Sequence, residues 1–145
     1  MRSSTIDEGG RIPDKHSHDG PNVSPAIEWI GVPNDAAEIV LMCCDPDAPS
    51  GTFLHWLVTG IHPHTGGVPE GRTPPEGRVW PNDFGADGWG GPAPPPGHGP
   101  HHYRFEVYAL AEPVELPDRP NADDVYRATE GIAVAQGTLV GIYER

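Results

Sequence analysis

Apolar residues along the chain gather in short runs that predict β-strands. Residues 38–44 are almost all apolar, a pattern typical of a strand that is buried on both faces. A second apolar run covers residues 55–61, and apolar and polar side chains alternate through residues 102–110. Shorter strands are expected at residues 24–29 and 138–143. The chain is therefore predicted to be mostly β.

One helix is predicted near the C-terminal end of the chain. Asn121 is a favourable N-cap residue, and two aspartates in the next turn suit the positive end of a helix. Val125 and Ile132 belong to a narrow apolar stripe with helical spacing. These signals predict a helix over residues 122–135, which ends before Gly137.

Glycine and proline interrupt the rest of the chain. The 145 residues include 19 Gly and 19 Pro, which favours short strands and long loops over a helical bundle. Residues 62–102 have almost no apolar periodicity, and a loop of that length in a small protein usually carries function. No internal repeat or linker divides the sequence, so residues 1–145 are expected to form one domain.

The net charge of −12 argues against some classes of partner. A field of that sign disfavours nucleic acid and anionic membrane surfaces. The only cysteines, Cys43 and Cys44, are adjacent in a predicted strand and cannot bridge each other without strain, which suits a reducing compartment. Neither a signal peptide nor an apolar run of membrane-spanning length is found. We therefore expect a cytoplasmic protein that neither binds nucleic acid nor inserts stably into a membrane.

Candidate chemistry lies where the predicted strands meet their loops. Asp45 follows the first apolar run inside an Asp-Pro-Asp-Ala-Pro segment whose prolines stiffen the chain, and His55 opens the next strand. The alternation in residues 102–110 places His101 and Tyr103 on one face, at the end of the core. Two imidazoles and a phenol would supply donors for a small phosphorylated ligand, and the Asp45 carboxylate would orient one imidazole and favour its charged form. The same spacing also suits a plain Pro-Asp turn.

Two segments resemble the phosphatidylethanolamine-binding proteins, which are also called Raf kinase inhibitor proteins. The first segment is Asp45–Pro49 with His55 and Trp56, and the second is Pro94–Tyr103. The bacterial and archaeal branch of the family is resembled by two further segments, Ser24–Trp29 and Asn82–Gly85. The resemblance extends from Ile12 to the C-terminus. It implies an antiparallel Greek-key β-sandwich with an anion pocket at one end. The one C-terminal helix and the long Gly/Pro-rich loops predicted above would belong to this fold. The pocket residues that it implies are Asp45, Asp47, His55, Pro94, Pro95, His101 and Tyr103.

The resemblance also implies a function. Members bind a small anion or a phosphorylated headgroup, such as phosphate or a phosphoethanolamine-like group, without catalysis, and some regulate kinases or proteases. No cofactor is expected; bacterial members are often dimeric, so a homodimer is one expectation, and no protein partner is assigned. This chain departs from the family pattern at His102, which replaces an arginine expected to brace a carboxylate. It also stops at Arg145, soon after the final predicted strand, so we expect it to lack the further C-terminal helix of eukaryotic members.

Two other functions fit the same residue types. Ser50, His55 and Asp45 are the residue types of a hydrolase triad, although no Gly-x-Ser-x-Gly elbow surrounds the serine. The second alternative is a metal site built from histidines, for which no cysteine ligand pattern is present. The histidines considered for it are His62, His64, His98, His101 and His102.

Overall fold

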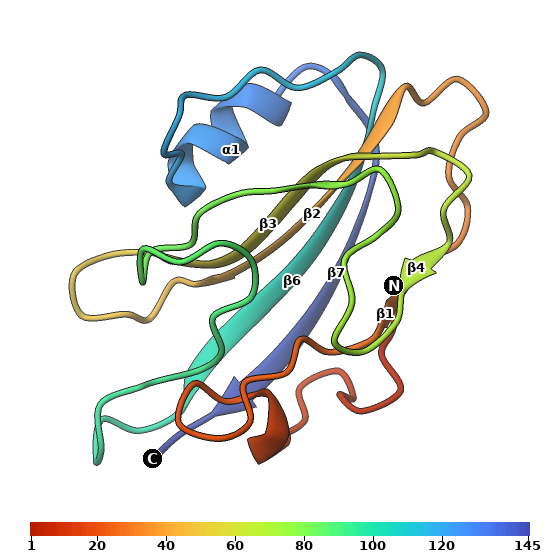
Figure 1. The fold of residues 1–145 in the computed structure, drawn as a ribbon. Coiled ribbons are helices and arrows are strands. Elements are labelled where there is room, and N and C mark those ends of the chain that lie inside the picture. Colours follow the sequence, from red (N-terminus) through yellow and green to blue (C-terminus); the bar gives the residue numbers. More distant parts are fainter.

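The computed structural model describes residues 1–145, which are organised by two antiparallel sheets (Figure 1). The larger sheet has five strands in the order β5-β3-β2-β6-β7. Its strands are β2 (Glu38–Asp45), β3 (Phe53–Ile61), β5 (Arg78–Val79), β6 (His101–Leu110) and β7 (Ala133–Tyr143). The smaller sheet pairs β1 (Ile27–Glu28) with β4 (Gly67–Val68). The helical segments are the short 3-10 helix η1 (Asp14–His16) and the helix α1 (Ala122–Thr129).

The strand order of the larger sheet is that of a Greek key. Strands β2, β3 and β5 follow one another and are neighbours in this sheet, and the long connection after β5 then brings β6 back beside β2. Strand β2 is antiparallel to both of its neighbours. The mostly β, antiparallel Greek-key sandwich expected from the sequence is therefore confirmed, and so are its one α-helix and its long loops.

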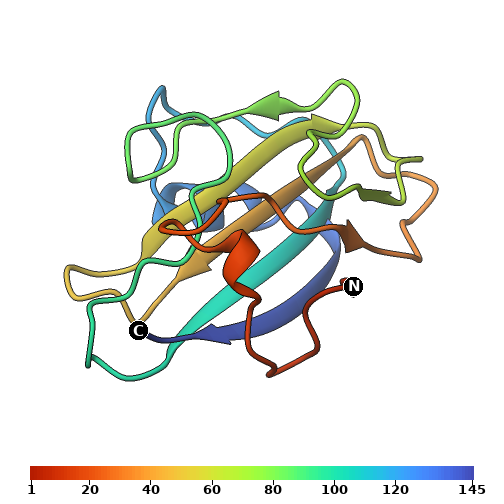
Figure 2. The same ribbon diagram turned by 60° about the horizontal axis from the view of Figure 1, so that its bottom comes forward.

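The central strand of the larger sheet is buried on both faces, as the apolar run in β2 predicts, whereas the edge strands β5 and β7 are partly exposed. Every residue of β2 is buried. One face packs against the small sheet and the N-terminal segment, with Ile27 and Trp29 in the shared cluster. The other face packs under α1, where Val125 is buried (Figures 1 and 2). Because neighbours in a strand point to opposite faces, Cys43 belongs to the first cluster and Cys44 to the second.

Helix α1 is shorter than the sequence pattern predicts. Its start is as expected: Asn121 and Asp124 form a capping box, in which each side chain accepts a hydrogen bond from the other residue's N–H. The helix ends at Thr129 instead of continuing to residue 135, and β7 begins at Ala133. From there β7 pairs with the whole length of β6, so strand pairing overrides the helical preference of the local sequence.

The ends of two other predicted elements also differ from the sequence pattern. The strand expected at residues 24–29 is reduced to the two residues of β1, and the final strand begins at Ala133 instead of residue 138. Residues 62–102 are irregular apart from β4, β5 and the first residues of β6, as expected. This long connection passes the ends of β2, β3 and β6, where the candidate site lies (Figure 2).

Candidate functional site

A β-bulge positions the side chain of His55. Two successive residues of β2, Cys43 and Cys44, pair with Trp56 and Leu54 of β3, so His55 is the extra residue between them. A bulge removes one residue from the ladder and re-aims its side chain. This irregularity therefore sets the buried orientation of the His55 ring.

The loop after β5 holds the His55 ring in place. Nδ1 of His55 donates to the Gly90 carbonyl oxygen at 2.6 Å, and the Gly90 N–H donates to the His55 carbonyl oxygen at 2.9 Å. A Cβ atom at Gly90 would collide with the Phe84 ring, and one at Gly91 would collide with the His16 carbonyl. These two glycines therefore allow the loop to approach the sheet closely enough to bind the histidine.

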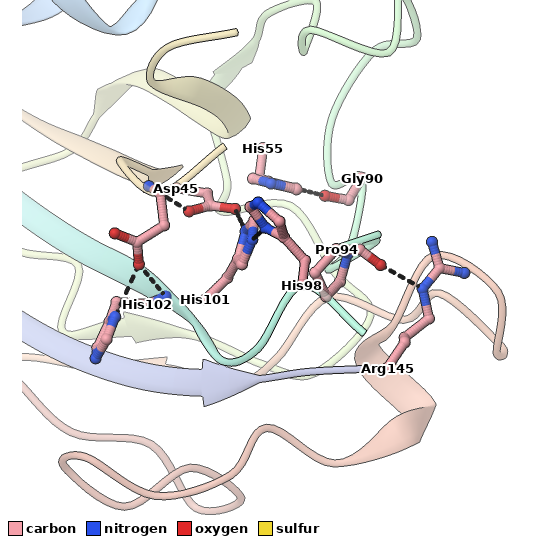
Figure 3. A network of polar contacts seen from close by, with 9 residues as sticks. Asp45, His55, Gly90, Pro94, His98, His101, His102 and Arg145 are labelled. Atoms are coloured by element: carbon pink, nitrogen blue, oxygen red, sulfur yellow. Dashed lines mark hydrogen bonds and ion pairs between the residues drawn. The ribbon is translucent and has the colours of Figure 1, made fainter. Parts of the chain in front are cut away.

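Asp45 and His101 form the inner pair, the buried centre of the site (Figure 3). Asp45 ends β2 and His101 begins β6, which pairs with β2. Nδ1 of His101 donates to Oδ2 of Asp45 at 2.6 Å, and Oδ1 of Asp45 accepts from the Asp47 N–H at 2.8 Å. The side chains of His101 and Asp45 are only 2% and 4% exposed. Asp45 therefore orients a histidine, the role expected for it.

The side chain of His98 occupies the other ring nitrogen of His101. Nδ1 of His98 lies 2.6 Å from Nε2 of His101, so a carboxylate and two imidazoles form one chain of hydrogen bonds (Figure 3). His98 comes from the exposed part of the loop before β6. The sequence pattern indicated His98 only as a metal-ligand candidate, and no local signal pairs it with His101.

Asp47 and His102 form an outer pair beside the inner one. Oδ2 of Asp47 accepts from the His102 N–H and from its Nδ1, both at 2.8 Å. Burial alone would raise the pKa of Asp47, but the hydrogen bonds from His102 lower it below its ordinary value. His102 thus provides the brace that was expected from an arginine. Because His102 points away from the core face that His101 joins, its contact turns Asp47 away from the pocket.

The C-terminal residue supports the pocket loop. Nε of Arg145 donates to the Pro94 carbonyl oxygen at 2.7 Å (Figure 3). The Arg145 carbonyl oxygen accepts from the Gly97 N–H at 2.9 Å, and its guanidinium also pairs with Asp19. Pro94 is buried and Pro95 is exposed. The loop is therefore fixed at both ends of the turn that presents these prolines.

These elements enclose a cavity of about 220 Å³. Its lining residues are Asp45, Ala48, Pro49, Ser50, Phe53, His55, Phe84, Ala93, Pro94, Pro95, His101 and Tyr103. The structure therefore brings together six of the seven residues expected there, and Asp47 is the exception. The sequence reasoning missed the aromatic wall of Phe53 and Phe84, whose ring centroids are 4.7 Å apart. Phe84 lies in the Asn82–Gly85 segment, which resembles the bacterial and archaeal branch, but the resemblance implied no pocket role for it.

Two titratable groups of the cavity, His55 and Tyr103, are neutral near pH 7. Burial lowers the pKa of His55 to about 4, against the raising effect of its bond to Gly90. The ring is therefore neutral near pH 7, with its proton on Nδ1 and an acceptor at Nε2. This differs from the expectation that both imidazoles of the pocket supply donors, because the remaining ring nitrogen of neutral His55 can only accept. Burial and the nearby Asp45 carboxylate raise the pKa of Tyr103, whose hydroxyl stays protonated.

The geometry bears on the two alternative functions as well. In a Ser50–His55–Asp45 triad, Asp45 would hold the His55 ring. In the structure Gly90 holds that ring, and Asp45 binds His101 instead. No group of three or more His, Cys, Asp or Glu side chains is arranged to hold a metal ion.

The chain matches the phosphatidylethanolamine-binding protein family over residues 2–144. A UPF0098 protein of Methanothermobacter thermautotrophicus is 38% identical over 150 residues, and the alignment covers 100% of this chain and 98% of that protein. A Mycobacterium tuberculosis protein named "Putative lipoprotein LppC" is 42% identical, with 99% of this chain and 71% of the relative covered. No helix of the structure has the length and apolar character needed to cross a membrane. In view of the mycobacterial relative's name, the cytoplasmic location stays a prediction.

Two solved structures share the fold. YbcL of E. coli, described as a new member of the mammalian PEBP family, superposes with a TM-score of 0.91 at 28% identity, covering 99% of this chain and 96% of that one. The homologue CT736 of Chlamydia trachomatis gives a TM-score of 0.86 at 30% identity, covering 99% and 95%. Sequence and fold agree, and the chain belongs to the bacterial and archaeal branch of the phosphatidylethanolamine-binding protein family.

Proposed function

We propose that the cavity binds a small anion of the phosphate type, without a chemical step. The ligand is either free phosphate or the phosphoryl part of a headgroup such as phosphoethanolamine. The observation that carries this proposal is the hydroxyl of Tyr103. It is the one buried side-chain polar atom without a hydrogen bond of good geometry, although the Asp45 carboxylate lies close enough to raise the pKa of Tyr103, and Tyr103 lines the cavity. Leaving such a group unpaired costs about 1–3 kcal/mol, which a ligand oxygen that accepts its proton would recover.

The other polar groups of the cavity suit the same ligand. The Asp45 carboxylate is already engaged by His101 and by the Asp47 N–H, so its oxygens are directed to protein donors. A phosphoryl group offers several acceptor oxygens to Tyr103 and to His101. When it carries a proton, it also offers a donor to the neutral His55 ring. Membership of the family supports a ligand-binding role in general.

The apolar part of the lining supports a ligand of limited size. Phe53, Phe84 and the two prolines form a wall without charge, and the cavity volume of about 220 Å³ suits a small group. Local donors must overcome a net charge of −12 on the whole chain. We therefore expect modest affinity for inorganic phosphate and higher affinity for a phosphoryl group that carries an apolar or headgroup extension.

Replacing Tyr103 with phenylalanine tests this proposal. We expect Y103F to bind phosphate and phosphoethanolamine about tenfold more weakly, because a hydrogen bond to a charged ligand is lost. We expect its free energy of unfolding to stay equal or to rise by about 1 kcal/mol, because an unpaired buried hydroxyl is removed. Titration followed by NMR and urea denaturation measure the two effects.

Tyr108→Phe is the matched control on the same strand. Its hydroxyl lies on the opposite face of β6 and donates to Glu106 at 2.9 Å. We expect Y108F to lose about 1–2 kcal/mol of stability and to keep its phosphate affinity. If wild type binds neither phosphate nor phosphoethanolamine, or if Y103F binds them as tightly as wild type, the proposal is wrong.

A further inference from the structure

Both ring nitrogens of His101 are occupied by protein groups. Asp45 takes Nδ1 at 2.6 Å, and His98 takes Nε2 at 2.6 Å. The ring itself is 2% exposed and is held at the start of β6. Nδ1 already donates to Asp45, so an anion in the cavity can accept a hydrogen bond from this ring only at Nε2, and only when the ring carries a proton on both nitrogens. In that state Nδ1 of His98 accepts the Nε2 proton when no anion is bound. The anion and His98 therefore require the same atom.

We infer that His98 is an internal, displaceable plug, which competes with the anion for Nε2 of His101. This inference rests on the proposed function and adds to it a regulation of ligand access. In the absence of anion, His98 satisfies a buried nitrogen that would otherwise be unpaired. When an anion binds, His98 leaves and the anion takes its place on the same nitrogen.

The loop around His98 allows such a movement. Gly97 and Gly99 flank it with φ angles of +75° and +87°, a region that glycine adopts without strain. The side chain of His98 makes no hydrogen bond other than the one to His101, and the residue is exposed. The segment on its N-terminal side is held at Pro94 and Gly97 by Arg145. The imidazole can therefore rotate out while the prolines of the cavity wall stay in place.

The competing interpretation is that His98 helps to bind the anion, as a further donor. The two interpretations differ in the sign of one effect. A ligand contact strengthens binding, so its removal weakens binding. A plug keeps part of the population closed, and the apparent dissociation constant is the intrinsic one divided by the open fraction, so its removal tightens binding.

Phosphate titration of His98→Ala decides between them. If a hydrogen bond of ordinary strength holds the plug, we expect H98A to bind phosphate about fivefold more tightly than wild type. His64→Ala is the control, because His64 is an exposed histidine after β3 and does not line the cavity, and we expect the affinity of H64A to stay unchanged. We expect H98A to unfold at a slightly lower urea concentration than wild type, because Nε2 of His101 loses its partner, and to be fully folded in the absence of urea, because His98 itself is exposed.

A second measurement uses the wild-type protein. In ¹H–¹⁵N spectra of the imidazole rings, added phosphate should move the His98 signals to the positions of an exposed, unbonded histidine. An unchanged or weaker phosphate affinity of H98A, or His98 signals that do not move when phosphate saturates the site, would overturn the plug and leave the proposed function standing. Absence of phosphate binding in both wild type and H98A would overturn both.

Discussion

Replacing His101 with alanine should destabilise the protein by about 3–5 kcal/mol, although this residue lies at the end of the sheet. Its partner Asp45 would keep a buried carboxylate that has lost its main donor, and an uncompensated buried charge is costly. The hydrogen bond from the Asp47 N–H would remain, but it satisfies only one carboxylate oxygen. Urea denaturation at pH 7 measures the loss.

The outer pair provides a built-in control for this prediction. Asp47 and His102 make a contact of similar length, 2.8 Å, between side chains that are 41% and 51% exposed. We expect His102→Ala to cost less than about 1 kcal/mol, because solvent screens an exposed pair. Adding Asp45→Asn to His101→Ala should recover part of the loss, since the charge is then removed. Equal costs for H101A and H102A would show that burial of the inner pair does not matter.

The buried ring of His55 should make folding stability depend on pH. Its pKa is about 4 in the folded protein and near 6.5 when it is exposed. As the pH falls below 6.5, the unfolded chain takes up a proton that the folded protein cannot accept. The stability that His55 contributes is therefore complete above pH 6.5 and is lost as the pH falls to about 4. The difference between these two pKa values corresponds to roughly 3 kcal/mol of folding stability.

His55→Asn isolates this contribution from those of other groups. Asparagine does not titrate, and its amide N–H can still donate to the Gly90 carbonyl. Burial also lowers the pKa of His16, so wild type and variant share that part of the pH dependence. We expect the difference in unfolding free energy between the two proteins to shrink steadily from pH 7 to pH 4. Two parallel stability curves would mean that the His55 ring takes up its proton without cost.

The sequence pattern predicts the walls of the site better than its contacts. The apolar run of β2 locates Asp45 at a strand end, and the alternation in β6 places His101 and Tyr103 on one face. These inferences need only the strand period, which is local. They hold because a buried sheet leaves each side chain only two directions.

Contacts between distant segments could not be predicted in this way. The bulge that leaves His55 without a paired residue in β2 depends on the register between β2 and β3. The strand period alone does not predict this register. The contact between His98 and Nε2 of His101 depends on the conformation of the glycine-flanked loop that carries His98. The same applies to Asp47: the strand period predicts that His102 faces outward, but not that it contacts Asp47. Helix α1 ends early for a related reason, because the pairing of β7 outweighs a local preference.

The two adjacent thiols of β2 give the fold a reporter for each of its layers. Cys43 is buried in the cluster under the small sheet, and Cys44 in the cluster under α1. Burial raises the pKa of the Cys44 thiol to about 11, and of Cys43 even more clearly, so neither reacts while its layer is closed. A thiol reagent would then modify Cys44 when α1 separates from the larger sheet, and Cys43 only when the small sheet and the larger sheet separate. Partial and global opening of this small protein thus become separable along one strand.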